Sequence, residues 1–225
     1  MFPIDCYLRC NIILGGAVVN NILTRYGILL AFALLIVSVG VANVQARVIV
    51  YEKEKFYSVR GETGVQIFLN LLKSSTKVSN SNHAIASTEI KFDIKNIKGL
   101  ASRRNCKVSN VDVIVSLVYT YPKWRGYNRA GLKAKKNWDK FMREVRKHER
   151  KHGRIAVDAA HKIERGFKRG RGKVAKKCSD WGQSITRKVG PLIARHHKRQ
   201  VQFDKREHNR YSRVTRSIIA LIKSK

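Results

Sequence analysis

The sequence predicts an α+β fold in which a small, mostly antiparallel sheet is followed by a long helix and by further helices. Two observations support this prediction. Apolar and polar residues alternate in several segments before residue 122, as in half-buried strands, whereas from residue 135 onward the apolar residues recur with the period of a helix. Strands that precede long helices are typical of α+β proteins.

Length and composition agree with one folded domain. The chain has 225 residues, of which 44% are hydrophobic, so it can bury a sizeable core and is not wholly disordered. No repeat with a period of about 20–50 residues is present, which excludes a repeat array. The net charge is +32, and nucleic-acid binding is the first function that such a charge suggests.

Residues 1–46 are predicted to be a signal peptide. An uncharged apolar run occupies residues 26–41, and small residues then precede a cleavage site after Ala46. The alternative is an uncleaved anchor in the inner membrane over residues 26–45. In either case residues 47–225 are expected to form one exported domain, periplasmic or secreted.

Two cysteines, Cys106 and Cys178, lie in the exported part. Because an exported domain meets an oxidising compartment, this even pair is expected to form one disulfide. Two buried free thiols are the alternative. Neither cysteine lies in a CxxC motif, so a zinc ribbon or a thioredoxin-like redox site has no support.

Strands are expected to dominate the first part of this domain. The expected segments are strands over 48–59, 90–95 and 111–121, and a helix over 65–72. Pro122 is expected to end the last of these strands, and a polar loop over 123–133 should follow it.

Helices are expected in the second part. Trp138, Phe141 and Val145 begin an apolar stripe that predicts a long helix over about 135–164, ended by Gly166. A further helical stretch is expected over about 174–189, with Pro191 near its end. Residues 210–225 form a basic tail without an assigned structure.

The long helix bears an HExxH motif formed by His148, Glu149 and His152. Residues four apart lie on one helix face, so both imidazoles can bind one zinc ion, while Glu149 can take a proton from a zinc-bound water. The motif fills a gap in the apolar stripe between Val145 and Ile155, so its side chains are expected to face inward. A buried, hydrogen-bonded histidine pair without metal is the alternative.

A third zinc ligand is needed, because a catalytic zinc usually has three protein ligands and an open position. The metzincin extension would use Asp158, but it also requires glycine where Ile155 stands. Asp204 and His208, four residues apart near the end of the chain, are the best remaining donors.

These residues are part of a longer ordered pattern. Its elements are Val118-Tyr119-Thr120-Tyr121-Pro122-x-Trp124, Trp138-x-x-Phe141, the HExxH motif, Ile155-Ala156, Ala159-Ala160, Cys178, and Phe203-Asp204-x-x-x-His208. With this pattern the chain resembles, over about residues 48–208, the bacterial family called domain of unknown function 922, whose members are predicted secreted zinc-dependent proteases. It departs from the family at Phe203, where tyrosine is usual, and at Asn209, where glycine is usual.

The resemblance implies a single zincin-like domain with a zinc site. It implies that His148 and His152 bind zinc, that Glu149 is the catalytic base and that His208 completes the site. Asp204 would then either support a ligand through a hydrogen bond or bind the metal itself.

Most of the positive charge lies in the helical half, because residues 123–225 carry a net +25 and residues 47–122 only +6. Five bases flank the motif and are expected mostly on the solvated face of its helix: Arg146, Lys147, Arg150, Lys151 and Arg154. Surface solvation explains such charge, and anionic envelope polymers or acidic substrates are the functional alternative. Nucleic acid is less expected, since the chain shows no stacking pattern of aromatic residues.

The sequence thus predicts a secreted zinc-dependent hydrolase, a metallopeptidase in which Glu149 activates a zinc-bound water against a peptide or protein substrate. The alternative is a non-catalytic, cationic envelope-binding module stabilised by zinc and a disulfide. Membrane contact is expected only through the N-terminal segment, if it is not cleaved.

Overall fold

The strands precede the long helices, which confirms the predicted α+β class. The computed structural model describes residues 45–74, 84–102, 105–169, 173–175, 180–207 and 211–224. The elements in chain order are β1 (Gln45–Val59), α1 (Gly64–Ser74), β2 (Ser87–Ser102), β3 (Asn105–Trp124), the 3-10 turn η2 (Tyr127–Arg129), α2 (Leu132–Arg169), β4 (Lys173–Ala175), α3 (Trp181–Glu207) and α4 (Arg213–Ile222).

The sheet is mixed, with β3 between β1 and β2. β2 and the short β4 run antiparallel to β3, as predicted, but β1 runs parallel to it. Alternation of apolar residues fixes which face of a sheet a side chain occupies and says nothing of strand direction. The parallel pairing was therefore not visible in the sequence.

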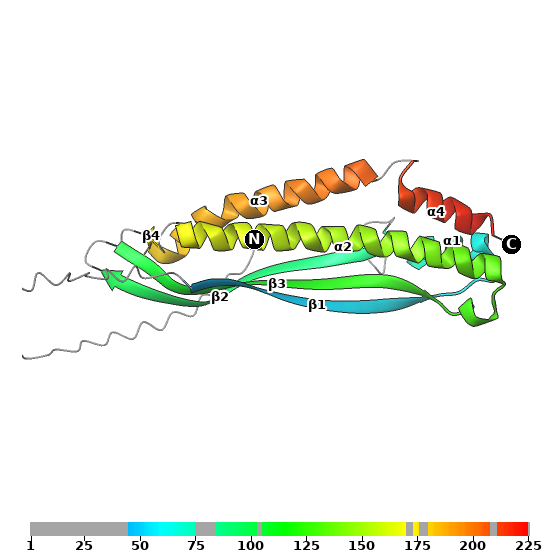
Figure 1. Cartoon of the computed structure of the whole chain (residues 1–225), viewed down its shortest axis with the longest axis horizontal. Helices are drawn as coiled ribbons and strands as arrows, with labels where there is room; N and C mark the ends of the chain where they lie inside the picture. The colour runs from blue at the N-terminus through cyan, green and yellow to red at the C-terminus, as the bar shows by residue number, and fades with distance from the viewer. Residues whose placement is uncertain are drawn as a thin grey trace, which may run out of the picture. The chain divides into compact units, whose positions relative to one another are not determined.

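Helix α2 lies across one face of the sheet, and α3 runs back along the other side of α2 (Figure 1). Alternate residues of β3 form the buried face of the sheet: Val111, Val113, Val115, Leu117, Tyr119 and Tyr121. The apolar stripe of α2 packs against this face through residues that include Trp138, Phe141 and Val145. Burial of this apolar surface holds the HExxH helix against the sheet.

Pro122 does not end β3, contrary to the prediction. The strand continues to Trp124, whose side chain is buried and not part of a polar loop. The last residue of β3 that pairs with β2 is Thr120, so β3 has β1 alone beside it at Pro122. Proline is tolerated there because it lacks an N–H where no ladder bond is required on that side.

Two helices also run past their predicted ends. α2 continues through Gly166 to Arg169, because Phe167 is buried in the core. α3 contains Pro191 in its interior, and the predicted helix start near residue 174 is instead β4. Packing of apolar side chains on both sides of these residues outweighs the cost of glycine or proline in a helix.

The basic tail, to which the sequence assigns no structure, contains helix α4. Ser212 caps α4 by accepting a hydrogen bond from the backbone of Thr215 at 3.0 Å. Leu221 is fully buried, and a Cβ atom at Gly64 of α1 would lie 1.7 Å from its carbonyl oxygen. Glycine is thus needed where α1 approaches the end of α4.

No helix in the described part of the chain is long and apolar enough to cross a membrane. The apolar run over 26–41 lies outside the described residues. The predicted cleavage site after Ala46 falls within β1, where Gln45 and Ala46 pair with Asn110 and Val111. Signal cleavage and export stay predictions.

Candidate metal centre

Three potential ligand atoms meet where α3 packs against the HExxH face of α2. The Nε2 atoms of His148 and His152 lie 3.2 Å apart. Oδ1 of Asp204 lies 3.4 Å from Nε2 of His148 and 2.9 Å from Nε2 of His152. The helix period brings the two histidines together, whereas Asp204 joins them only because the two helices pack side by side.

This arrangement fits a zinc ion. Zinc binds nitrogen and oxygen ligands at about 2.0–2.1 Å in tetrahedral geometry, which places neighbouring ligand atoms about 3.3–3.4 Å apart. Two of the three separations in the cluster, 3.2 and 3.4 Å, are close to that value, and the third, between His152 and Asp204, is shorter at 2.9 Å. Two imidazole nitrogens and one carboxylate oxygen also match the ligand types of catalytic zinc and leave a fourth position for water or substrate.

Helix α3 provides more than the carboxylate. The ring of Phe203 lies 4.8 Å from that of His148 and 5.0 Å from that of His152, centre to centre. One turn earlier, Oε1 of Gln200 lies 2.7 Å from Nδ1 of His152. The ring of His152 therefore has Phe203 and Gln200 as neighbours on α3, and the ring of His148 packs against Phe203.

The charges within the cluster favour an ionised carboxylate. Burial raises the pKa of Asp204, but hydrogen bonds from His148 and His152 hold it well below its ordinary value. Burial lowers the pKa of His152, but hydrogen bonds with Asp204 and Gln200 raise it overall. An ionised carboxylate is the form that binds a metal.

Glu149 is buried beside the cluster, with 6% of its surface exposed. Thr88 of β2 donates a hydrogen bond of 2.7 Å to its Oε2. Burial raises the pKa of Glu149, and the bond from Thr88 and the nearby histidine charges offset part of this rise. The inward orientation predicted from the apolar stripe is confirmed, and a raised pKa is suited to a general base.

Two of the five bases that flank the motif contact the sheet, although 40% of each side chain is exposed to solvent. Arg146 lies 2.9 Å from Glu54 and 4.5 Å from the ring centre of Tyr121. Arg150 lies 3.0 Å from Glu54 and 4.5 Å from the ring centre of Tyr119. The other three are exposed, as predicted: Lys147, Lys151 and Arg154.

A cleft of about 710 Å³ opens beside the candidate metal centre. The start of β2, the middle of α2, the end of α3 and the start of α4 border it. Its polar lining residues include His148, Glu149, His152 and Asp204, and its apolar ones include Ile85, Ile90, Val214 and Ile218. Such a volume is typical of ligand-binding clefts.

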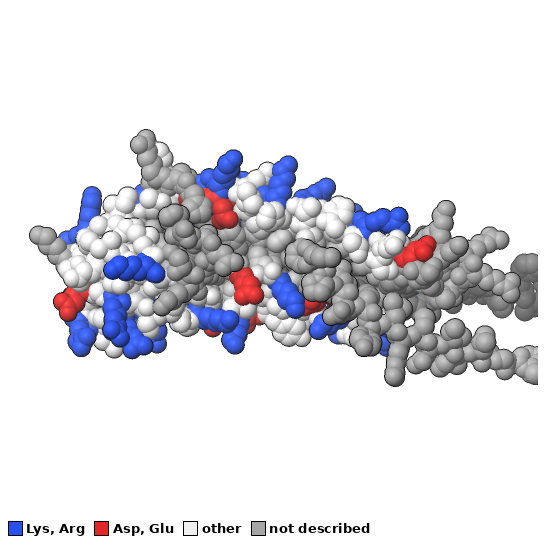
Figure 2. Space-filling view, turned by 180° about the vertical axis from the view of Figure 1, so that it is seen from behind, with Lys and Arg blue, Asp and Glu red and all other residues white. Residues whose placement is uncertain are grey.

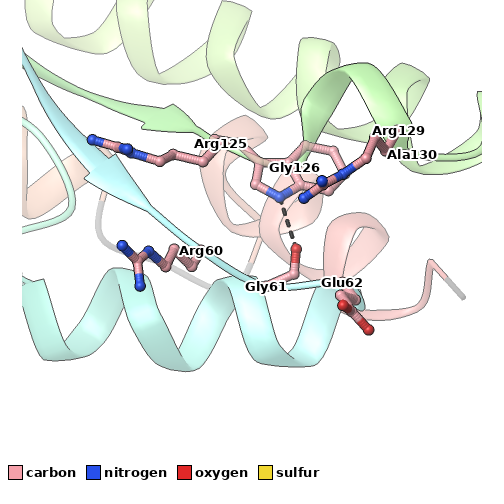
Figure 3. Close-up of a pocket in the computed structure, with 8 residues that line it drawn as sticks. Arg60, Gly61, Glu62, Arg125, Gly126, Arg129 and Ala130 are labelled. Carbon is pink, nitrogen blue, oxygen red and sulfur yellow. Dashed lines mark hydrogen bonds between the residues drawn. The ribbon is translucent and has the colours of Figure 1, made fainter.

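A second cavity, of about 550 Å³, lies where β1 and β3 end. Arg60, Arg125 and Arg129 line it together with Glu62 (Figure 3). Trp124, which also lines it, donates a hydrogen bond of 2.8 Å from Nε1 to the carbonyl oxygen of Gly61. Within the described ranges, no carboxylate forms an ion pair with these arginines. Basic side chains also lie close together at this end of the domain when it is seen from behind (Figure 2).

The remaining predicted site residues have different outcomes. Cys106 is buried in β3, but Cys178 and His208 lie outside the described residues, so the disulfide and the His208 ligand stay predictions. Asp158 lies apart from the cluster and pairs with Arg199 at 3.3 Å.

Sequence reasoning missed Thr88, His196 and Gln200. The last two precede Asp204 at intervals of four residues, so the helix period could have placed them on its face. Thr88 left no such signal, because its contact with Glu149 depends on how β2 is aligned with β3 and on how α2 lies over the sheet.

Comparison with known proteins agrees with the sequence pattern. A family model described as "Bacterial protein of unknown function (DUF922)" matches residues 54–211, which include the HExxH motif and Asp204. Neither the curated proteins nor the solved structures contain a match to the chain. Because the family model matches well over half of the chain, the protein belongs to the DUF922 family of bacterial proteins of unknown function.

Proposed function

We propose that this protein is an exported zinc-dependent hydrolase, a metallopeptidase. The observation that carries the proposal is the convergence of two imidazole nitrogens and one carboxylate oxygen, all within 3.4 Å of one another, beside the buried Glu149. The adjoining cleft gives a substrate access to these groups.

In this proposal three residues bind the metal and a fourth, Glu149, transfers protons. His148, His152 and Asp204 hold the metal, which when bound acts as a Lewis acid and lowers the pKa of water. Glu149 accepts the proton of the attacking water and then donates it to the leaving amine. Its burial, which raises its pKa, suits a group that must both take and give a proton near neutral pH.

The position of β2 favours a peptide as the substrate. β2 has β3 on one side, and no other described strand pairs with its outer edge. Its first residues, with those just before them, border the cleft. An extended peptide can pair with such an edge through main-chain hydrogen bonds, which places its carbonyl groups near the candidate metal centre.

The proposal is tested with the purified full chain. We expect about one zinc per chain, lost in His148→Ala, His152→Ala and Asp204→Ala. Glu149→Gln should retain zinc and lose hydrolysis of denatured casein and of a peptide library. His208→Ala, measured in parallel, shows whether that residue also binds. A folded wild-type chain that binds no zinc refutes the site, and hydrolysis that survives Glu149→Gln refutes the role of the base.

The arginine-lined cavity favours a second function, the binding of anionic envelope polymers. Guanidinium groups bind carboxylates and phosphates through paired hydrogen bonds, and Arg60, Arg125 and Arg129 have no carboxylate partner among the described residues. Retention of the full chain on immobilised polygalacturonate should fall as salt rises.

Two triple variants with the same change in charge distinguish polymer binding in this cavity from binding through the net positive charge of the protein. Changing its three arginines to glutamine should weaken retention more than the same change at the exposed Lys147, Lys151 and Arg154. Glu149→Gln should leave retention unchanged. Equal losses in the two triple variants would mean that net charge alone binds the polymer.

A further inference from the structure

His152 makes contacts through both of its ring nitrogens. Its Nε2 lies 3.2 Å from Nε2 of His148 and 2.9 Å from Oδ1 of Asp204, so Nε2 is the atom that would bind a metal. Its Nδ1 lies 2.7 Å from Oε1 of Gln200, which is one turn before Asp204 on α3. The Nδ1 edge of the His152 ring therefore has a hydrogen-bond partner of its own, Gln200.

The other hydrogen bonds of Gln200 fix the direction of its amide. Its Nε2 lies 3.1 Å from the carbonyl oxygen of His152 and 2.8 Å from Nε2 of His196. A carbonyl oxygen can only accept a hydrogen bond, so the amide nitrogen must be the group that faces it. The amide oxygen is consequently the group that faces Nδ1 of His152.

This direction determines where the proton of His152 resides. An amide oxygen can only accept, so Nδ1 of His152 must carry the hydrogen. Nε2 lies 2.9 Å from the carboxylate of Asp204 and shares a proton with it when no metal is bound. When a metal takes the place of that proton, the ring is neutral with its one N–H at Nδ1, and the lone pair of Nε2 is directed at the position between His148 and Asp204. That is the tautomer in which a histidine binds a metal.

His196 completes the hydrogen-bonded chain. It is 9% exposed and packs edge-on against Phe92, with ring centres 5.0 Å apart. Burial lowers the pKa of His196 and favours its neutral form, whose Nε2 can accept the second N–H of Gln200. Both amide hydrogens and the amide oxygen of Gln200 are thereby engaged, which restrains rotation of the side chain.

We infer that Gln200 is a positioning residue that holds His152 in the Nδ1-protonated tautomer and orients its Nε2 toward the metal. The inference rests on the proposed zinc site and adds to it a residue that does not touch the metal. Partners that hydrogen-bond to ligating histidines typically change metal affinity by about 10–100-fold when they are replaced.

Three variants of the full chain test the inference through zinc affinity, measured by competition with a chromogenic chelator. Gln200→Leu removes the acceptor at similar size and should weaken binding by about 10–100-fold. Gln200→Glu keeps an acceptor toward Nδ1 but loses the donor to the carbonyl of His152, so it should bind zinc more tightly than Gln200→Leu. Gln202→Leu makes the same chemical change at an exposed position of α3 and should not alter the affinity.

Nitrogen NMR of the histidine rings in the metal-free chain gives an independent readout. His152 should carry a hydrogen on Nδ1 in the wild type, and in Gln200→Leu that hydrogen should be lost in favour of Nε2–H, which Asp204 can accept. If that variant does not fold, Gln200→Asn, which withdraws the amide by one methylene, should show the same losses. Unchanged affinity and tautomer in the folded variant would overturn the inference and leave the zinc site intact. Failure of the wild type to bind zinc would instead overturn the proposed function.

Discussion

The hydroxyl of Thr88 donates a hydrogen bond of 2.7 Å to Oε2 of Glu149 and so connects strand β2 to the candidate base on α2. The same hydroxyl lies 3.1 Å from the backbone carbonyl of Glu149, so it contacts both the main chain and the carboxylate of this residue. Because Thr88 also lines the cleft, the strand that borders the cleft restrains the direction of the carboxylate.

Replacing Thr88 with valine should therefore impair turnover more than metal binding. The change removes the donor at similar volume and leaves the carboxylate of Glu149 free to rotate, so we expect turnover to fall by about tenfold, within what a general base contributes. Zinc affinity should stay within about twofold of the wild type, because Thr88 does not contact the ligands. Thr186→Val, on the exposed side of α3, is the control. Equal turnover in the two variants would contradict a positioning role for Thr88.

A second prediction concerns Gly153, directly after the HExxH motif. A Cβ atom there would lie 2.1 Å from the hydroxyl oxygen of Tyr119 and 3.1 Å from Leu117 Cδ1. Gly153→Ala should therefore push α2 away from the sheet and destabilise the protein by about 1–3 kcal/mol, measured by urea unfolding.

Gly166 provides a matched control on the same helix. Nothing lies within 4 Å of a Cβ atom at Gly166, so alanine meets no obstacle there. Gly166→Ala should stabilise the protein by about 0.4–1 kcal/mol through the lower entropy of the unfolded chain. If both substitutions stabilise, α2 does not approach the sheet as closely as described.

The third prediction is an acid-sensitive contact at Asp112, which is 1% exposed. Hydrogen bonds from Arg47 and Asn96 hold the pKa of Asp112 below its ordinary value, although burial acts in the opposite direction. A group whose folded pKa is depressed adds stability above its unfolded pKa, and this stability is lost as the pH falls through the folded value.

Asp112→Asn should therefore lower stability at pH 7 and reduce the further loss between pH 5 and pH 2. Hydrogen bonds to charged groups suggest about 1–2 kcal/mol at pH 7, measured by urea unfolding over this pH series. Asp158→Asn, at a side chain that is 58% exposed, is the control and should change the profile little. A profile for Asp112→Asn that is parallel to that of the wild type would contradict the assignment.

The fourth prediction is the disulfide between Cys106 and Cys178. β4 pairs with β3 so that Ala175, three residues before Cys178, lies opposite Cys106. Non-reducing peptide mapping of the full chain, produced under oxidising conditions, should find the two cysteines linked. Replacing both with serine should cost about 2–4 kcal/mol of stability, and reducing the wild type should cost a similar amount. Free thiols in the chain produced under oxidising conditions would refute the link.

Periodicity predicted the faces of the elements better than their ends. The alternation from Val111 to Tyr121 and the stripe from Trp138 to Ile163 are both buried as expected. The ends of the elements depended on tertiary contacts instead. α2 continues past Gly166 because Phe167 is buried in the core, and β3 can include Pro122 because β2 does not pair with it there. A glycine or proline does not end a helix or strand when the packing of the residues on either side stabilises that element by more free energy than the glycine or proline costs.

The sequence by itself determined that His148, Glu149 and His152 share the inner side of one helix, because a spacing of four and a gap in an apolar stripe are local properties of that helix. Only the tertiary structure decided what meets them. Asp204 and Gln200 reach His152 across the packing of α3 on α2, and Thr88 reaches Glu149 through the alignment of β2 on β3. Contacts between distant segments depend on which elements pack together and in which direction, and a helical or strand period cannot encode that choice.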